Sequence, residues 1–98
     1  IYCGVKSGVL GLTRSAAVDL GPKGIRVNAV APGSVPTEGV SINVDASMVE
    51  KRIAKTPMRR LGTVQDIASA VCYLASSESD WVTGECIKVD GGVTHAFL

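Results

Sequence analysis

The sequence lacks an excess of charge of either sign: ten lysines and arginines stand against nine aspartates and glutamates, which leaves a formal net charge of +1. This balance gives no electrostatic reason to expect nucleic acid or an anionic membrane surface as a partner. Long apolar runs are also missing, since none approaches the roughly 18 residues of a membrane-spanning helix, and no signal-peptide pattern opens the chain. We therefore expect a globular chain with no nucleic-acid partner and no membrane segment.

Cysteine is scarce, and its spacing fits neither a disulfide framework nor a metal site. Cys3, Cys72 and Cys86 are odd in number and stand far apart in the sequence. Reduced thiols in a cytoplasmic protein, with no bound metal, are the simplest interpretation. The 98 residues allow one domain at most. Because residue 1 is Ile and not Met, we expect the chain to be part of a longer protein.

The most regular segment runs from Tyr2 to Leu20, where apolar residues recur at helical spacing. This pattern predicts a helix that ends at Gly21-Pro22. The apolar stripe expected to pack consists of Val5, Val9, Leu12, Ala16 and Leu20. A second row contains Gly4, Gly8 and Gly11. Each glycine inside a helix costs about 1 kcal/mol relative to alanine, so we expect another backbone to approach this row closely.

Two short apolar segments, 25–31 and 85–89, are predicted to be strands. A crossover of about fifty residues between them is typical of a parallel α/β unit. Asn28 would then need hydrogen-bond partners inside the sheet. Two parallel strands cannot complete their ladders or bury both faces alone. The predicted fold class is therefore α/β, as the last two strands and flanking helices of a larger, doubly wound parallel sheet.

Between the strands, the sequence predicts a short helix over about 46–54 and a longer one that ends near Ser76. Thr63 is the expected N-cap of the longer helix, and Asp66 occupies the acidic position of a capping box. Residues 34–45 have no clear period and are expected to form a loop. Trp81 is expected to be the apolar anchor of a turn before the last strand.

Tyr2 and Lys6 stand at i and i+4 of the first predicted helix, which places them on one face. An ammonium beside a phenol favours the phenolate and lowers a pKa that is about 10 in free tyrosine. Such a tyrosine is suited to proton transfer to or from an alcohol oxygen. The spacing alone also fits an ordinary solvated helix face. Other parts of the chain must decide between these interpretations.

Further landmarks follow in a fixed order, and with Tyr2-x-x-x-Lys6 they make the chain resemble the C-terminal part of a short-chain dehydrogenase/reductase. They are 24–33 (Gly-Ile-Arg-Val-Asn-Ala-Val-Ala-Pro-Gly), 60–63 (Arg-Leu-Gly-Thr), 82–85 (Val-Thr-Gly-Glu) and 89–92 (Val-Asp-Gly-Gly). The resemblance implies a Rossmann-type fold, with residues 1–98 as a partial NAD(P)-binding domain. It also implies an oxidoreductase that uses NAD or NADP and acts on a carbonyl or secondary alcohol.

By this resemblance, Tyr2 is the general acid of carbonyl reduction and the base of alcohol oxidation. Lys6 lowers the Tyr2 pKa and binds the nicotinamide ribose. The remaining cofactor-binding candidates follow one another along the turn after the first strand: Pro32, Gly33, Val35 and Thr37. Glycine permits close backbone approach to a ligand at the carboxyl end of a parallel strand. The alternative is a plain strand-to-loop turn in which Thr37 caps a helix.

The resemblance also places the segment 36–57 over the substrate. Its candidate contacts are Glu38, Ser41, Ile42, Val44 and Met48, although for each of them a solvated or packed side chain is the simpler interpretation. Enoyl reduction is disfavoured, because related enoyl reductases usually have six residues between tyrosine and lysine. The glycine-rich phosphate turn and the catalytic serine and asparagine of the family are not in this sequence, so the chain alone is expected to be inactive. Family members commonly form homodimers or homotetramers. The competing hypothesis is therefore a non-catalytic fragment that associates through the glycine-lined helix and the last strand.

Overall fold

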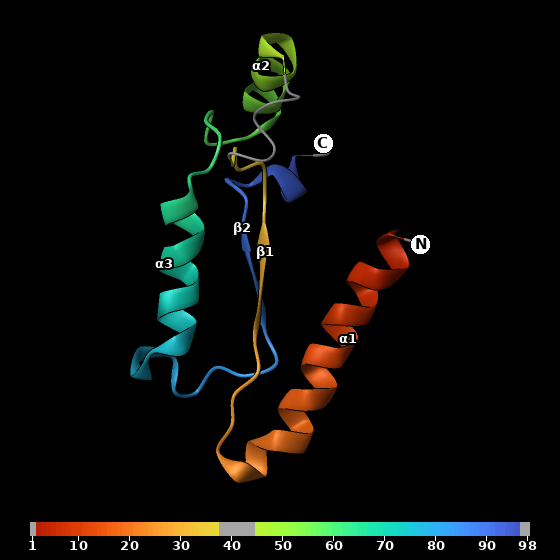
Figure 1. The fold of residues 1–98 in the computed structure, drawn as a ribbon, viewed down its shortest axis with the longest axis vertical. Coiled ribbons are helices and arrows are strands. Elements are labelled where there is room, and N and C mark those ends of the chain that lie inside the picture. The colour runs from red at the N-terminus through yellow and green to blue at the C-terminus, as the bar shows by residue number, and fades with distance from the viewer. Residues whose placement is uncertain (1, 38–44, 97–98) are drawn as a thin grey trace. The chain divides into compact units, whose positions relative to one another are not determined.

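The computed structural model describes residues 2–37 and 45–96 (Figure 1). In chain order the helices and strands are α1 (Tyr2–Leu20), β1 (Ala29–Pro32), α2 (Ala46–Lys55), α3 (Val64–Ala75) and β2 (Cys86–Val89). Short 3-10 turns cover Gly21–Lys23, Ser77–Ser79 and Val93–His95. The chain divides into two compact units, Ile1–Val30 with Val71–Ile87 and Ala31–Ala70 with Lys88–Leu98. The helices among the described residues are too short or too polar to cross a membrane.

β1 and β2 are hydrogen-bonded neighbours in one sheet. The Ala29 N–H donates to the Glu85 carbonyl at 2.8 Å, and the Gly33 N–H donates to the Val89 carbonyl at 2.9 Å. Residue numbers increase in the same direction along both strands, so the pair is parallel. The predicted α/β class, with helices between parallel strands, is confirmed.

The strand Ala29–Pro32 is shorter than the predicted segment 25–31. Before Ala29, the Gly84 N–H donates to the Val27 carbonyl at 2.7 Å, and the other cross-strand hydrogen bonds go to side chains. The Val27 N–H donates to the Thr83 hydroxyl at 3.0 Å. The Asn28 amide donates to the Val82 carbonyl at 2.9 Å and accepts from the Glu85 N–H at 3.1 Å. The expectation that Asn28 needs partners is confirmed, and those partners explain why regular pairing starts later.

In the first unit, α1 has the predicted bounds but ends differently from the prediction. Gly21 and Pro22 begin a 3-10 turn instead of capping the helix. The chain reverses at Gly24, which has a φ of 75° and donates its N–H to the Gly21 carbonyl at 2.9 Å. Glycine adopts this left-handed conformation without steric cost. The cap predicted at Gly21 therefore lies three residues later.

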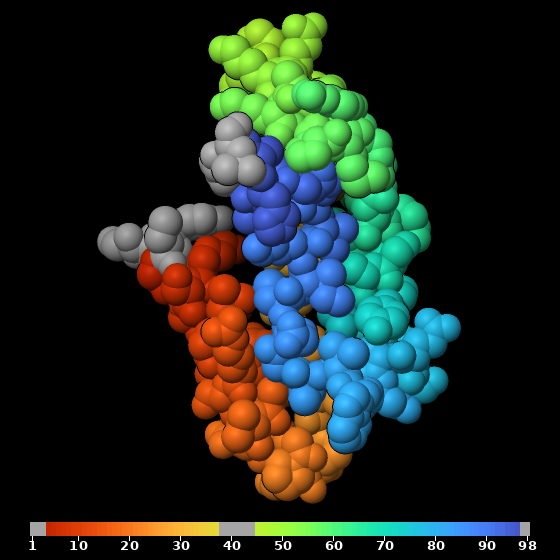
Figure 2. All heavy atoms as spheres, turned by 180° about the vertical axis from the view of Figure 1, so that it is seen from behind, coloured from red at the N-terminus to blue at the C-terminus, as the bar shows by residue number. Residues whose placement is uncertain are grey.

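The face of α1 that packs is also different from the predicted one. Ala17 is 5% exposed, whereas Val5 and Leu12 of the predicted stripe are 60% and 70% exposed. The backbone at Gly84 packs here, since a Cβ built on it would lie 3.4 Å from the Ala17 Cβ. Apart from adjacent backbone of α1 itself, no described atom lies within 4 Å of a Cβ built on Gly4, Gly8 or Gly11. The expected backbone neighbour of this row is therefore absent from the described residues. Side chains of α1 are visible at the surface in Figure 2.

Arg26 joins the end of α3 to the segment that follows it. Its Nη1 donates to the Leu74 carbonyl at 2.9 Å and to the Ser79 hydroxyl at 2.8 Å, and its Nη2 donates to the Ser76 carbonyl at 3.1 Å. The Leu74 carbonyl lies in the last turn of α3, where no helical N–H reaches it, so the guanidinium and the Ser79 hydroxyl satisfy it. Trp81 is 98% exposed and anchors nothing among the described residues, contrary to the prediction. Arg26 and the buried Ser79 hold this turn instead.

We expect Arg26→Lys in the full-length protein to lower the free energy of unfolding by about 1–3 kcal/mol, because an ammonium keeps the charge but cannot reach the same set of acceptors. Urea unfolding followed by circular dichroism measures the change. Arg14→Lys, at an exposed position on α1, is the matched control and should change stability little. Equal stability of the two variants would contradict this role of Arg26.

The second unit contains α2, whose N-cap is Asp45. The Asp45 carboxylate accepts from the Met48 N–H at 2.9 Å and from the Ser47 hydroxyl at 2.8 Å. These two hydrogen bonds, the Met48 one first, lower the pKa of Asp45. The helix covers Ala46–Lys55, which confirms the helix predicted over about 46–54. Because Asp45 caps α2, Thr37 does not cap it.

Candidate active site

The first candidate group lies on α1 in the first unit. Tyr2 is the first residue of the helix, and Lys6 follows one turn later. An α-helix rises 1.5 Å per residue with 3.6 residues per turn, so the two positions share a face, as predicted. Lys6 is exposed. The Tyr2 side chain lies outside the described part of the chain, and its proton-transfer role stays a prediction.

The second candidate group lies in the second unit, at the turn after β1. Pro32 is the last residue of the strand, and Gly33 continues its pairing with Val89. A Cβ on Gly33 would lie 2.7 Å from Cα and 2.8 Å from Cβ of Asp90. Gly33 has no positive φ, so its backbone conformation does not require glycine. Glycine is required because there is no room for a side chain. Val35 is half-buried and Thr37 is exposed.

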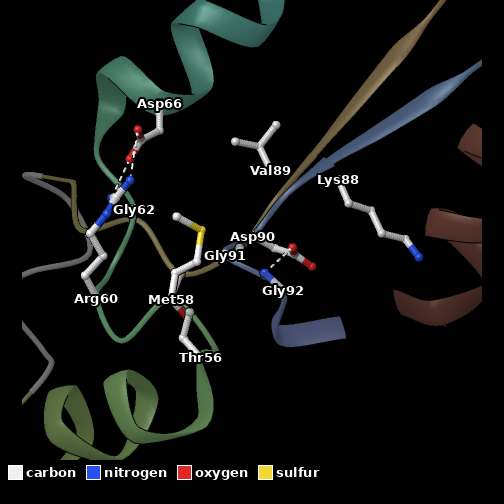
Figure 3. Close-up of a pocket in the computed structure, with 12 residues that line it drawn as sticks. Thr56, Met58, Arg60, Gly62, Asp66, Lys88, Val89, Asp90, Gly91 and Gly92 are labelled. Carbon is white, nitrogen blue, oxygen red and sulfur yellow. Dashed lines mark hydrogen bonds and ion pairs between the residues drawn. The ribbon is translucent and has the colours of Figure 1, made fainter. Parts of the chain in front are cut away.

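The turn after β1 opens onto a cavity of about 370 Å³ within the second unit (Figure 3). The turn, the segment after α2, the start of α3 and the end of β2 all contribute to its wall. The lining residues are Gly33, Ser34, Thr56, Met58, Arg60, Gly62, Asp66, Lys88, Val89, Asp90, Gly91 and Gly92. The carboxyl ends of parallel strands are where such sheets bind ligands. Pro32, Val35 and Thr37 are not among the lining residues.

Asp90 organises the chain at the end of β2. Its carboxylate accepts from the Gly92 N–H at 2.9 Å, and from both the N–H and the hydroxyl of Thr94. The Thr94 hydroxyl and then the Gly92 N–H lower the pKa of Asp90. Gly91 and Gly92 have φ values of 62° and 91°, which glycine adopts without strain. This corner is a tight, hydrogen-bonded turn.

On the other side of the cavity, the predicted capping box at the start of α3 is confirmed. The Thr63 N–H donates to Asp66 at 2.8 Å, and the Asp66 N–H donates to the Thr63 hydroxyl at 3.1 Å. Arg60 adds two hydrogen bonds to the same carboxylate, at 2.7 and 3.3 Å, as Figure 3 shows. The Arg60 guanidinium, followed by the Thr63 hydrogen bonds, holds the pKa of Asp66 well below its usual range.

Sequence reasoning left several residues of this cavity without a role. Segment 89–92 served only as a landmark, although its Asp-Gly-Gly pattern predicts a tight turn. In segment 60–63, only Thr63 had a predicted role, as the N-cap of a helix. Of the proposed substrate contacts, residues 38–44 lie outside the described chain, and Met48 of α2 is 42% exposed and does not line the cavity. Among the described residues, no three His, Cys, Asp or Glu side chains are grouped to hold a metal ion.

The lowered pKa of Asp66 predicts a specific pH dependence. The contribution of its ionised form to stability is complete above the ordinary carboxyl pKa of about 4, and is lost as pH falls through the lower pKa of the folded state. We expect the stability difference between the full-length protein and its Asp66→Asn variant to be largest near neutral pH and to shrink below pH 4. Urea unfolding over a pH series measures this. Asp80→Asn, at an exposed aspartate, is the control, and a difference independent of pH would contradict the expectation.

Comparison with known proteins supports the same class of fold. Residues 1–94 match the family model described as enoyl-(acyl carrier protein) reductase. A 3-oxoacyl-(acyl-carrier-protein) reductase of Buchnera aphidicola is 39% identical over 92 residues, which are 94% of this chain and 37% of that protein. The 7alpha-hydroxysteroid dehydrogenase of Escherichia coli K12 is 41% identical over 91 residues, covering 93% of this chain and 36% of that protein.

A solved structure extends this likeness to three dimensions. The crystal structure of 3-oxoacyl-(acyl-carrier protein) reductase from Brucella melitensis superposes with a TM-score of 0.88 at 40% identity, and the match covers 94% of this chain and 34% of that one. The described helices and strands are thus part of a Rossmann-type fold. The chain spans a little over a third of the length of the curated relatives it matches.

Proposed function

The chain belongs to the short-chain dehydrogenase/reductase family, and we propose that it supplies the proton donor and part of the nicotinamide site of an enzyme that interconverts carbonyls and secondary alcohols. One observation carries this proposal. Within the region that matches the family model, a helix beginning Tyr2-x-x-x-Lys6 is followed by a parallel strand that ends at Pro32 and is continued by Gly33. The two relatives reported above are named as a reductase and a dehydrogenase.

NAD or NADP is the proposed cofactor, and when bound it supplies or accepts the hydride. The fit of this chain to a nicotinamide rests on the turn after β1. Gly33 and Ser34 line a cavity of about 370 Å³ at the carboxyl end of a parallel strand, where such sheets bind ligands. Backbone groups of Val35 are suited to bind the carboxamide, and the Thr37 hydroxyl is suited to bind the carboxamide or a phosphate. Lys6 would bind the ribose hydroxyls.

In the proposed reaction, Tyr2 gives its phenolic proton to the carbonyl oxygen during reduction and takes one back during oxidation. Lowering a phenol pKa from about 10 to about 7 requires roughly 4 kcal/mol of differential stabilisation. One ammonium at about 4 Å supplies about 1 to 4 kcal/mol, depending on its exposure. Lys6 is exposed, so its stabilisation of the phenolate lies toward the lower end of this range. A second positive charge near the phenol, such as an oxidised nicotinamide ring, would make up the difference.

Reduction of a carbon–carbon double bond is a second candidate, because the matching family model is described as an enoyl reductase. A three-residue separation between Tyr2 and Lys6 favours carbonyl chemistry instead. Two of the relatives, a 3-oxoacyl reductase and a hydroxysteroid dehydrogenase, are named for reactions at oxygen-bearing carbons. Parallel assays of the full-length protein with a 3-oxoacyl thioester and an enoyl thioester separate the two reactions.

We expect Tyr2→Phe in the full-length protein to abolish reduction of a ketone panel while leaving NAD(P)H affinity nearly unchanged, because only the proton donor is lost. General acid catalysis contributes about 10² to 10⁴ in rate, which sets the minimum expected loss. Loss of NAD(P)H absorbance measures turnover, and fluorescence titration measures binding.

Tyr73→Phe is the matched control, since Tyr73 is the other tyrosine of the sequence and lies exposed on α3. It should retain normal turnover. Normal turnover by Tyr2→Phe would remove Tyr2 from the mechanism.

The 98 residues alone are proposed to be inactive and poorly folded. Ala17 is the one apolar residue that is buried among the described residues, whereas Val5, Leu12 and Val18 of α1 are mostly exposed. A single buried alanine supplies very little hydrophobic stabilisation against the entropy of ordering the chain. We expect no cooperative thermal transition when the isolated chain is followed by circular dichroism. A cooperative transition from a species of monomer mass would contradict this.

A homodimer or homotetramer is the proposed assembly of the full-length protein, because Val5, Leu12 and Val18 of α1 are mostly exposed and no other described segment packs on its glycine row. The alternative is a non-catalytic chain that binds other subunits, and it rests on the same exposed face of α1. Any coding sequence upstream of Ile1 in the gene would distinguish them. A strand followed by a glycine-rich turn supports the enzyme, since that turn binds the cofactor phosphates.

A further inference from the structure

We propose that Gly62 and Asp90 are positioning residues that hold the turn 33–35, here named the cofactor turn, in the shape that binds the nicotinamide. The inference rests on the function proposed above. It assigns roles to two residues that are not among the proposed cofactor-binding residues. Both residues lie in the second unit with the turn itself. Each contacts the cofactor turn from a different segment of the chain, one before α3 and one after β2.

Asp90 holds the first residue of the cofactor turn. The Gly33 N–H is fixed to the Val89 carbonyl at 2.9 Å, and a Cβ on Gly33 would lie 2.7 Å from the Asp90 Cα. This close approach is to backbone, which cannot move aside as a side-chain end can. Asp90 itself is held by hydrogen bonds from Gly92 and Thr94. The start of the turn therefore sits against a rigid corner.

Gly62 holds the other end of the cofactor turn. Its N–H donates to the Ser34 carbonyl at 3.0 Å, and a Cβ placed on it would lie 3.0 Å from the Val35 Cγ2. Val35 is the residue whose backbone is proposed to bind the carboxamide. A methyl group at residue 62 would push on this side chain and, through it, on that backbone.

The segment that carries Gly62 is itself rigid. Arg60 and Thr63, on either side of Gly62, both bind the Asp66 carboxylate, at 2.7 and 2.8 Å. Gly62 has no positive φ, so alanine is compatible with its backbone and its effect is confined to the contact with Val35. A displacement at residue 62 is therefore absorbed by the cofactor turn more readily than by the start of α3.

The test measures NADH and NADPH affinity of the full-length protein by fluorescence titration, together with thermal stability. Gly62→Ala should weaken binding of the preferred dinucleotide about tenfold, the effect of roughly one overpacked methyl. Its melting temperature should stay close to that of the unchanged protein. In a Val35→Ala background, where the Cγ2 atom is absent and the backbone groups remain, the same substitution should have little effect on affinity.

Asp90→Asn provides an independent variant that preserves side-chain size while removing the carboxylate acceptor of Thr94. It should also weaken dinucleotide binding, whereas Asp80→Asn, at an exposed aspartate of the first unit, should not. Unchanged affinity in both Gly62→Ala and Asp90→Asn would overturn the inference, as would an equal effect of Gly62→Ala with and without the Val35 side chain. If the unchanged full-length protein binds neither NADH nor NADPH, the proposed function fails and the inference fails with it.

Discussion

In the second unit, Gly33 packs directly against the backbone of Asp90, and there is no room between them for a methyl group. This contact adds to the Gly33–Val89 hydrogen bond at the ends of the two parallel strands. The turn after β1 and the Asp-Gly-Gly corner meet there, and both line the cavity. The arrangement uses a missing side chain to bring two backbones together, which is a common reason for glycine near a ligand site.

The first unit is held by polar interactions more than by apolar packing. Arg26 donates hydrogen bonds to the carbonyl groups at and just after the end of α3. The Asn28 side chain bonds to the backbone of Val82 and Glu85 before β1 begins. Such buried or half-buried polar networks specify geometry because leaving any one member unpaired is costly. The apolar side chains of α1 contribute little within the described residues, which is consistent with a chain that spans a third of its relatives' length.

Features determined by local sequence were predictable. The bounds of α1, the position of α2, the Thr63–Asp66 capping box and the parallel strand pair follow from periodicity, capping chemistry and crossover length. Features that depend on distant neighbours were not. The exposure of Trp81 and of the apolar stripe on α1 depends on what packs against them, and a periodic pattern identifies a packing face without identifying its partner. In the candidate site, family landmarks located the turn after β1. The contacts of that turn with Gly62 and Asp90 join segments far apart in the sequence, so they could not be predicted from local patterns.

The exposure of Trp81 makes the chain suited to spectroscopy. It is the single tryptophan of the sequence, and 98% of its surface is open in the described structure. An indole in water emits at longer wavelength than one in an apolar environment and is accessible to dissolved quenchers. The emission of Trp81 therefore reports whether another part of the protein, or another subunit, covers the turn between α3 and β2.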